Sequence, residues 1–276
     1  MHSLSVHTIG ARPKEKSDAR KTAILFLSHL ANDKILEEYR KISEATRNTA
    51  KSYFLLHVKK QGAFFTEKNE DNIYRFTDDI SKALQHFHTA KSFAFQHFRI
   101  TKSFFPYSVH FPLLHFFIQN SNYDYYWLVE YDVRFSGDWK FFFESFQQVE
   151  ADFLTCRIRS YFDEPKWYWW RCIGHPEKFI SLEKRLSSFN PIYRISKSAL
   201  IHLHQSHRDG WYGHYEVLIP TLLYNSGFKL AGIGGNGKFV QSSERNKFYT
   251  GKTFRWRPVM KKIGTEINKL YHPIKL

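Results

Sequence analysis

The sequence predicts a single α/β domain with a central mixed, mainly parallel sheet flanked by helices. An apolar run at residues 23–27 precedes a helical pattern at 32–46, and a second apolar run follows at 52–58. A strand, a helix and a second strand in this order are typical of a parallel sheet with right-handed crossovers. In the middle of the chain, the uninterrupted apolar run 125–129 is typical of a strand buried on both faces by helices.

The other elements follow from shorter patterns. Helices are expected where apolar residues recur every three or four positions, and strands where short apolar or alternating runs stand between polar turns. Pro220 should kink its helix or lie in the first turn, because proline donates no backbone hydrogen bond. The expected strands are 73–76, 151–158, 190–196 and 228–230, and the expected helices are 111–120, 139–149, 197–205 and 215–224.

The chain is expected to divide into a flexible basic leader at residues 1–20 and a folded domain at 21–276. The first residues are polar and lack the apolar core of a signal peptide, and no run of about 18 apolar residues occurs. We therefore expect a cytoplasmic protein. Any contact with a membrane should be peripheral, at its inner face.

Composition limits the classes of partner. Among the 276 residues, 41 Lys and Arg outnumber 26 Asp and Glu, which gives a net charge of +15. This balance favours phosphorylated small molecules, nucleic acid or an anionic membrane surface. The only cysteines, Cys156 and Cys172, form no CxxC pattern, so a reducing compartment fits and a zinc site is not expected.

Two acids stand at the exit of the central strand. Glu130 and Asp132 are separated by one residue, so strand alternation would point both to the same side. Neighbouring carboxylates repel unless a positive group lies between them, and a hard divalent cation is the usual one. The alternative is that both acids are solvated and that the nearby Arg134 neutralises them.

The wider sequence around these acids resembles the glycosyltransferases of the A-type fold. Residues 126–139 and 210–216 carry the resemblance, which covers roughly residues 21–276. It implies a Rossmann-like domain whose acidic motif is Glu130-Tyr131-Asp132. In that family the motif holds Mn²⁺ or Mg²⁺ on the diphosphate of a UDP- or GDP-linked sugar. The resemblance makes Asp132 the stronger metal ligand, whereas Glu130 could contact the metal or the ribose.

The same resemblance assigns a general base and a third metal ligand. Glu216 is the expected base of an inverting transfer, with Asp163 or Glu164 as substitutes; a carboxylate in a first helical turn also suits the helix dipole. His272, near the C-terminus, is the expected metal ligand, and His214 competes with it for an imidazole role. Further candidates for the nucleotide-sugar site are Ser28, His29, Asp78, Asp79 and Lys275.

The acceptor site is expected near a tryptophan-rich segment at residues 160–176. Aromatic faces stack on sugars, although such a segment could equally fold over the core as a lid. Arg194 could bind a phosphate or a carboxylate of the acceptor, or it could be an ordinary exposed arginine. The acceptor would be a glycan or a lipid-linked molecule, as in surface polysaccharide or glycoconjugate synthesis. The acceptor-site candidates are Trp169, Trp170, Arg194, Trp211 and His214.

Two other functional classes stay open at this stage. A nucleic-acid-binding protein would also be basic, but its cations should form a stripe with interleaved aromatic residues, and here they are spread. The densest basic stretch, 238–262, could instead contact an anionic membrane or a phosphorylated lipid. A metal-dependent phosphoesterase would need more clustered ligands to hold two metals. Binding of UDP or GDP with Mn²⁺, and not of oligonucleotides, separates the first reading from these alternatives.

Overall fold

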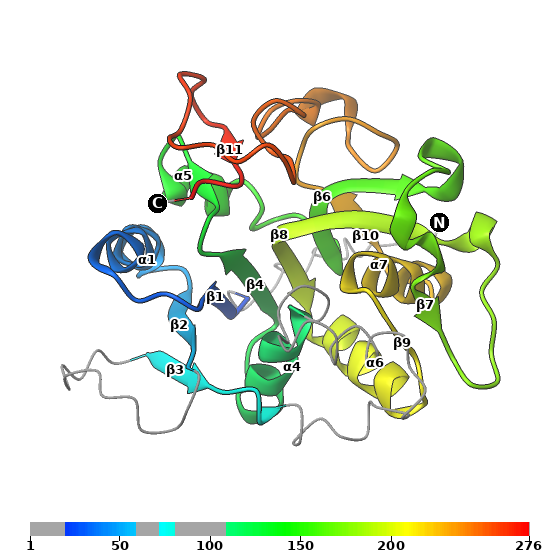
Figure 1. The fold of residues 1–276 in the computed structure, drawn as a ribbon. Coiled ribbons are helices and arrows are strands. Elements are labelled where there is room, and N and C mark those ends of the chain that lie inside the picture. Colours follow the sequence, from blue (N-terminus) through cyan, green and yellow to red (C-terminus); the bar gives the residue numbers. More distant parts are fainter. Residues whose placement is uncertain (1–19, 59–71, 81–108, 276) are drawn as a thin grey trace, which may run out of the picture.

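A seven-stranded mixed sheet forms the centre of the protein (Figure 1). The computed structural model describes residues 20–58, 72–80 and 109–275, so nearly all of the predicted leader lies outside the described residues. Only β8 runs opposite to the other strands of this sheet, which confirms the predicted mixed, mainly parallel topology. In spatial order the strands are β10 (Leu230–Gly232), β6 (Phe153–Ser160), β8 (Leu186–Ser196), β4 (Tyr125–Glu130), β1 (Thr22–Ser28), β2 (Lys51–His57) and β3 (Ile73–Phe76).

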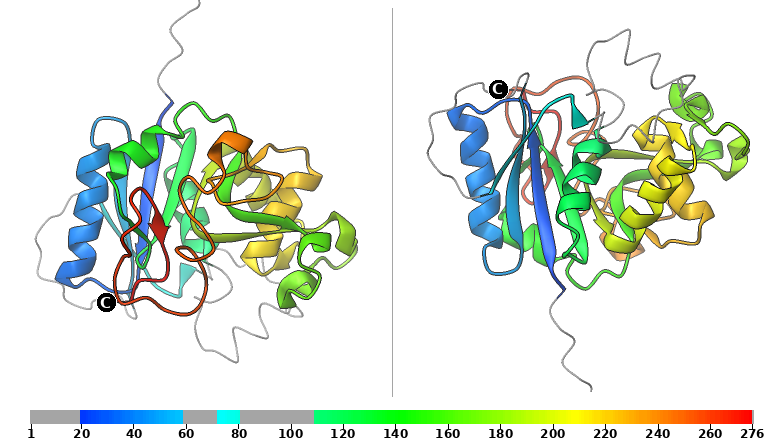
Figure 2. Two further views of the ribbon diagram at one scale, coloured as in Figure 1. Left: turned by 90° about the horizontal axis from the view of Figure 1, so that it is seen from above. Right: turned by 90° about the horizontal axis from the view of Figure 1, so that it is seen from below.

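Helices cover both faces of the sheet (Figure 2). On one face lie α1 (Asp33–Thr46) and α5 (Trp139–Glu144), and on the other lie α4 (His110–Gln119), α6 (Lys197–Arg208) and α7 (Tyr215–Asn225). Helix α1 begins where predicted because Asn32 Oδ1 accepts a hydrogen bond from the Ile35 N–H at 3.1 Å. Each helix thus buries an apolar side against the sheet.

The central strand β4 is buried on both faces, as predicted. Tyr126 and Leu128 belong to the apolar cluster under α4, α6 and α7, whereas Trp127 and Val129 belong to the cluster under α1 and α5. Strand alternation divides these four side chains between the two sides. Strand β4 therefore fixes its polar end, Glu130, firmly at one edge of the sheet.

Strand β8 extends beyond the end of β4. Val129 is the last residue of β4 to pair with β8, opposite Ile192, and the preceding residues of β8 pair with β6 alone as far as Ser160 opposite Leu186. The pairing of β6 and β8 is irregular, with shifts of register around Cys156. This extension forms one wall of the space beyond the end of β4.

The last described residues of the chain, 270–275, cover the exit of β4 from another side and are called the C-terminal strap (Figure 1). The strap includes β11 (Leu270–Tyr271), which pairs antiparallel with β5 (Arg134–Phe135). Farther along, the Ile274 N–H donates to the Asp132 carbonyl at 2.9 Å. Residues close to the C-terminus are therefore held against the turn that follows the central strand.

Helix α5 is shorter than the predicted 139–149. Beyond Glu144 the backbone forms tighter turns, with hydrogen bonds between residues three positions apart. The Phe146 N–H donates to the Phe143 carbonyl, and the Gln147 N–H donates to the Glu144 carbonyl. The guanidinium of Arg194 donates to the carbonyls of Phe146 and Val149 and so satisfies two acceptors of this non-helical segment. Helix α7, by contrast, continues through Pro220.

Short elements complete the fold and mostly belong to the loops around the site. Among the described residues, no helix is both long and apolar enough to cross a membrane. The short elements are η2 (Tyr161–Asp163), η3 (Tyr168–Arg171), β7 (Ile173–Gly174), η4 (Leu182–Lys184), β9 (Tyr212–Gly213) and η5 (Ser242–Glu244).

Candidate active site

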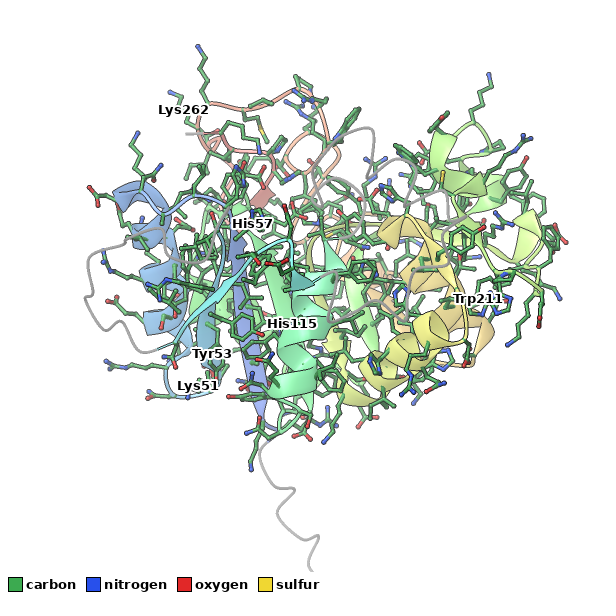
Figure 3. The ribbon with its side chains drawn as sticks, turned by 60° about the horizontal axis from the view of Figure 1, so that its bottom comes forward. Lys51, Tyr53, His57, His115, Trp211 and Lys262 are labelled. Carbon is green, nitrogen blue, oxygen red and sulfur yellow. The ribbon has the colours of Figure 1, made fainter. Side chains whose placement is uncertain are left out.

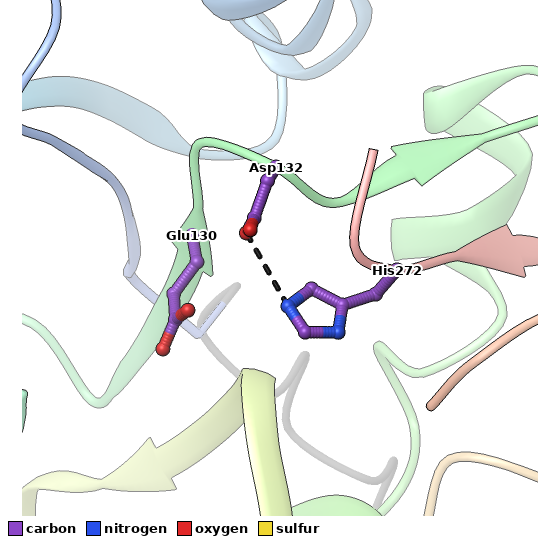
Figure 4. A group of neighbouring side chains, drawn as sticks. All are labelled: Glu130, Asp132 and His272. Carbon is purple, nitrogen blue, oxygen red and sulfur yellow. Dashed lines mark ion pairs between the residues drawn. The ribbon is translucent and has the colours of Figure 1, made fainter. Parts of the chain in front are cut away.

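Glu130, Asp132 and His272 converge at the exit of β4 (Figure 4). Each offers one ligand atom, and these atoms all lie within 4.8 Å of one another. Strand β4 ends at Glu130, and the Val133 N–H closes a turn on the Glu130 carbonyl at 3.0 Å. A turn, and not strand alternation as the sequence suggested, therefore brings Asp132 beside Glu130. His272 comes from the C-terminal strap.

Hydrogen bonding orients the ring of His272. Its Nδ1 lies 2.8 Å from the Arg255 carbonyl, and because a carbonyl can only accept, Nδ1 carries the proton. Nε2 lies 3.3 Å from Asp132 Oδ1, where a protonated ring would donate to the carboxylate and a neutral ring would offer its lone pair to a metal. A histidine whose second nitrogen donates to a carbonyl is the usual arrangement of a metal ligand.

The electrostatics of the two acids fit a bound cation. Burial, and the negative charges of Asp132 and Glu216, hold the pKa of Glu130 well above its usual value. Burial would raise the pKa of Asp132 too, but His272 and Lys275 outweigh it and lower this pKa to about 2. Glu130 Oε1 is also buried without a hydrogen-bond partner. Two carboxylates and an imidazole form a ligand set that could hold a divalent cation.

Lys275 lies beside this cluster. Its Nζ donates to Asp132 Oδ2 and, at 2.8 Å, to the Tyr131 hydroxyl. Arg134, which the sequence offered as the neutralising group, instead places Nε 3.5 Å from Glu38 Oε2 and donates to the carbonyls of Tyr131 and Val133. Arg134 thus stabilises the turn, while the charge that meets Asp132 comes from the C-terminal strap.

The cluster opens into a cavity of about 650 Å³. Its walls come from the ends of β1 and β4, the extension of β6 and β8, the tryptophan-rich segment, the start of α7 and the C-terminal strap. The sequence-predicted residues that line it are Glu130, Asp132, Trp169, His214, Glu216, His272 and Lys275.

Backbone packing places Glu216 in this cavity. Gly213 pairs with Ile173 at a φ of +155°, and a Cβ at this glycine would lie 2.2 Å from the Cys172 carbonyl oxygen. Only glycine permits so close an approach of two backbones. The chain then enters α7, whose second residue is Glu216.

The surroundings of Glu216 give it the properties of a base. Burial raises its pKa to about 8, although the backbone N–H of Asn190 and the charge of Arg157 oppose that effect. The charge of Glu216 in turn raises the pKa of Glu130, so the two carboxyl groups lie close enough to interact. A carboxylate with a raised pKa, close to the group of potential metal ligands, can accept a proton near neutral pH.

His214 has a structural position in the cavity wall. Its Nδ1 accepts a hydrogen bond from the Glu216 N–H at 3.3 Å and so caps α7. The ring stacks on Trp169, with centroids 4.7 Å apart and planes at 19°. Burial lowers the pKa of His214 to about 3, so the ring stays neutral. Cap and stack together hold both Glu216 and Trp169 in place.

The tryptophan-rich segment is both a lid and a cavity wall. Trp170 is buried and its Nε1–H donates to the Glu164 carbonyl at 2.7 Å, so the prediction that Trp170 contacts the acceptor is corrected: the residue anchors the segment. Trp169 lines the cavity, as do Trp167 and the exposed Tyr168, which the sequence reading did not single out.

Arg194 and Trp211 lie away from the cavity. Arg194 is buried, and its guanidinium donates to the carbonyls of Phe146, Val149 and Ala151, near the end of β4 opposite to Glu130. The expected acceptor contact of Arg194 is therefore corrected, because the side chain is buried away from the cavity and these carbonyls occupy its Nη1 and Nη2 donors. Trp211 packs its ring against His175 at 5.0 Å, beyond α6 (Figure 3), and does not line the cavity.

The four remaining nucleotide candidates lie at or just after the ends of β1 and β3, at the same edge of the sheet, but do not line the cavity. The Ser28 hydroxyl donates to the Leu30 carbonyl at 2.7 Å, and the ring of His29 meets that of Tyr131 edge-on at 4.8 Å. Asp78 Oδ1 lies 2.9 Å from His57 Nε2 at the end of β2 (Figure 3), and Asp79 accepts a hydrogen bond from the Thr77 hydroxyl at 3.2 Å. Their roles stay predictions.

The sequence reading missed several lining residues. Arg157 and Arg159 could have been found from the sequence, because they are two residues apart at the carboxyl end of a predicted strand. This is the edge at which α/β sheets bind ligands. Trp256 and Arg257 belong to the basic stretch 238–262, which the sequence offered for a membrane or a phosphorylated lipid but did not place at the acidic cluster. Of the substitute bases, Glu164 lines the cavity, whereas Asp163 accepts hydrogen bonds from Ser160 outside it.

No protein-family model and no curated protein matches this chain, but solved structures do. One is a protein from Bacillus anthracis described as a glucose-1-phosphate thymidylyltransferase, in complex with sucrose, with a TM-score of 0.42 and 11% identity over 77% of this chain and 86% of the other. Another is a glycosyltransferase involved in glycosylation of the major capsid of PBCV-1, with a TM-score of 0.33 and 9% identity over 76% and 81%. Such identities bear on the fold alone, and at these TM-scores no argument about function rests on them.

Proposed function

We propose that this protein is a metal-dependent glycosyltransferase that moves a sugar from a nucleoside-diphosphate donor to a glycan or lipid-linked acceptor. The observation that carries the proposal is one arrangement: three convergent ligand atoms within 4.8 Å of one another, with Glu216 on the same cavity. A metal site without a base would fit simple ion binding, and a base without a metal site would fit hydrolysis. Their combination in a cavity of about 650 Å³ suits group transfer between two bound substrates.

Asp132, Glu130 and His272 would hold Mn²⁺ or Mg²⁺. When bound, the ion would neutralise the charge that develops on the departing diphosphate. Lys275 already lies at Asp132 and supplies a further positive charge for the diphosphate of a UDP- or GDP-linked sugar. These residues thus form the donor end of the cavity.

Glu216 would take the proton from the acceptor hydroxyl. Its raised pKa makes the carboxylate a stronger base than an exposed glutamate, and its position on the cavity supports an inverting reaction. The ring of Trp169, held by its stack on His214, would offer an apolar face to a sugar. Acceptor selection would therefore depend on the tryptophan-rich segment.

The geometry favours this function over the two alternatives. Among the residues that the structure describes, a single group of at least three potential metal ligands is found, whereas a two-metal phosphoesterase would need a second set. The ligand cluster is largely buried at one end of a cavity, which suits a small-molecule donor better than a nucleic-acid strand.

We infer that the basic loop, residues 251–269, contacts anionic lipid at the inner face of a membrane. A lipid-linked acceptor would be met at the same place if the protein is cytoplasmic. Trp256 and Ile267 are 72% and 76% exposed, and Val259 and Ile263 are partly exposed beside them. Exposed apolar side chains among cations suit the interface of an anionic membrane. Trp256 also lines the cavity, which links this surface to the site. The loop's cations include Lys252, Arg255, Arg257, Lys261 and Lys262, the last of which projects outward in Figure 3.

A thermal-shift series tests the proposed function. UDP and GDP should raise the melting temperature with Mn²⁺ or Mg²⁺ and much less without, because a ligand that binds the folded state stabilises it by mass action. An oligonucleotide with Mn²⁺ is the control and should have no comparable effect. Stabilisation by the oligonucleotide alone would overturn the proposal.

A further inference from the structure

Strand β6 contains a strained residue at the cavity wall. Arg157 has a φ of +50°, in the left-handed region that residues other than glycine rarely occupy. It lies within the second shift of register in the pairing of β6 with β8, between Cys156 and Arg159. The Arg157 N–H donates to the hydroxyl of the buried Tyr249 at 2.7 Å, which holds this conformation. Such strain persists where the surroundings impose it, and it gathers at functional sites.

The irregular pairing presents two arginines to the cavity. Arg157 and Arg159 both line it, and the charge of Arg157 acts on Glu216. Irregularities of this kind re-aim side chains beside active sites. The positive charge of these arginines lies on the β6 wall, whereas Lys275 comes from the C-terminal strap and contacts Asp132. The cavity therefore has cations on two separate walls.

A second, open cavity of about 450 Å³ continues this positive wall. Arg159 lines both cavities, and Lys238 and Arg245 line the second one. Its acid, Asp163, already accepts two hydrogen bonds from Ser160, each of 2.7 Å. The wall thus presents several cations to solvent. The carboxylate among them, Asp163, is already hydrogen-bonded to Ser160.

Arg159 is available to a ligand. Its Nη1 lies 3.8 Å from Glu164 Oε2, and both side chains are partly exposed. Pairs of this length at a wet surface are weak, so a ligand can replace them. Arginine also recognises phosphate through two parallel hydrogen bonds, and several cations together favour a multiply charged phosphate over a single carboxylate.

We propose that Arg157 and Arg159, with Lys238 and Arg245 beyond them, form a subsite for a phosphate group of the acceptor. The diphosphate of the donor is already met by the metal cluster and Lys275, so this wall serves a second anion. That this anion belongs to the acceptor rests on the proposed function; the anion site itself does not. A sugar phosphate or a lipid-linked phosphate has the required chemistry.

Titration with inorganic phosphate tests the subsite. Protein saturated with UDP and Mn²⁺ is titrated with phosphate, with the free protein in parallel, by calorimetry and tryptophan fluorescence. Arg159→Gln and Lys238→Gln should each weaken phosphate binding at least about tenfold while the Kd of UDP with Mn²⁺ stays unchanged. Lys140→Gln removes an exposed cation on α5 and is the matched control, with no expected effect.

The outcomes separate the subsite from the proposed function. If Arg159→Gln weakens UDP binding as much as phosphate binding, the arginines belong to the donor and the subsite is overturned. If the UDP complex binds no phosphate, the subsite is overturned while the metal site stands. If UDP does not bind but the free protein binds phosphate through Arg159, the subsite stands and the proposed function fails.

The strain at Arg157 supplies a second test. Arg157→Gly should weaken phosphate binding without lowering the melting temperature, because glycine adopts a positive φ at little cost. A protein that melts at a clearly lower temperature would mean that Arg157 is retained for stability. That result, together with unchanged phosphate affinity, would overturn its place in the subsite.

Discussion

His272 Nε2 lies 3.3 Å from Asp132 Oδ1, and the Arg255 carbonyl holds the opposite nitrogen of the ring. The two residues come from distant parts of the sequence, the turn after β4 and the C-terminal strap. Their meeting depends on the strap, which the Ile274 N–H fastens to the Asp132 carbonyl. The backbone bond of Ile274 to Asp132 thus holds His272 in the candidate metal site.

Asp132→Asn should abolish the stabilisation by UDP with Mn²⁺ and reduce transfer by more than roughly 100-fold, the upper end of the loss caused by removing an outer-shell partner of a metal. The neutral amide keeps the shape of the side chain but cannot match the charge of a carboxylate ligand. The melting temperature and transfer rate are measured, with Asp33→Asn, an exposed acid in the first turn of α1, as the control. A fully active Asp132→Asn variant would refute the metal assignment.

Transfer should depend on pH through Glu216. With a pKa of about 8, this carboxyl group is protonated below that pH and cannot act as a base. The rate should therefore rise about tenfold per pH unit between about pH 6 and 8 and level off above it. Rates are measured with saturating donor, together with the Kd of UDP at each pH.

Glu216→Gln is the matched variant for that profile. It should bind UDP with Mn²⁺ as the wild type does and lose transfer at every pH, because the amide cannot accept the proton. Loss of donor binding in this variant, or a rate in the wild type that does not change with pH, would show that Glu216 is not the base.

Gly213→Ala should destabilise the protein by about 1–3 kcal/mol and lower transfer, since the new methyl group would meet the Cys172 carbonyl at 2.2 Å. Gly227→Ala is the control: its φ is +81° and nothing lies within 4 Å, so it carries the backbone cost without the clash. Chemical denaturation measures both. Equal losses of stability would show that the contact with Cys172 does not constrain the start of α7.

The basic loop should bind vesicles that contain phosphatidylglycerol and not vesicles of phosphatidylcholine alone, and salt should weaken the binding. Ile267→Ser should reduce the partition coefficient roughly tenfold, because it removes one exposed apolar side chain from the interface. Phe179→Ser, which changes an exposed aromatic residue outside the loop, is the control in a co-sedimentation assay. Equal partitioning of Ile267→Ser and wild type would exclude this surface.

Local pattern was enough to predict most of the fold. Helix α1 begins at the asparagine that caps it, and the alternation in β4 divides its side chains between two apolar clusters. The end of α5 was not predicted, because the apolar pattern continues to Val149 while the backbone beyond Glu144 closes tighter turns, such as that of the Val149 N–H on the Phe146 carbonyl. A hydrophobic pattern alone does not distinguish such turns from a continued helix.

From residue types and spacing came the α/β class and the pair of acids after the central strand, which follow from periodicity and from charge placed beside apolar runs. The candidates Glu216 and His272 came from the family resemblance of the sequence. The tertiary structure added what depends on contacts between distant segments. It brings both His272 and Lys275 to Asp132, places Arg194 and Trp170 outside the cavity, and places Arg157 on the same cavity as Glu216. A side chain's role depends on which neighbours occupy its hydrogen bonds, and only the folded chain brings those neighbours together.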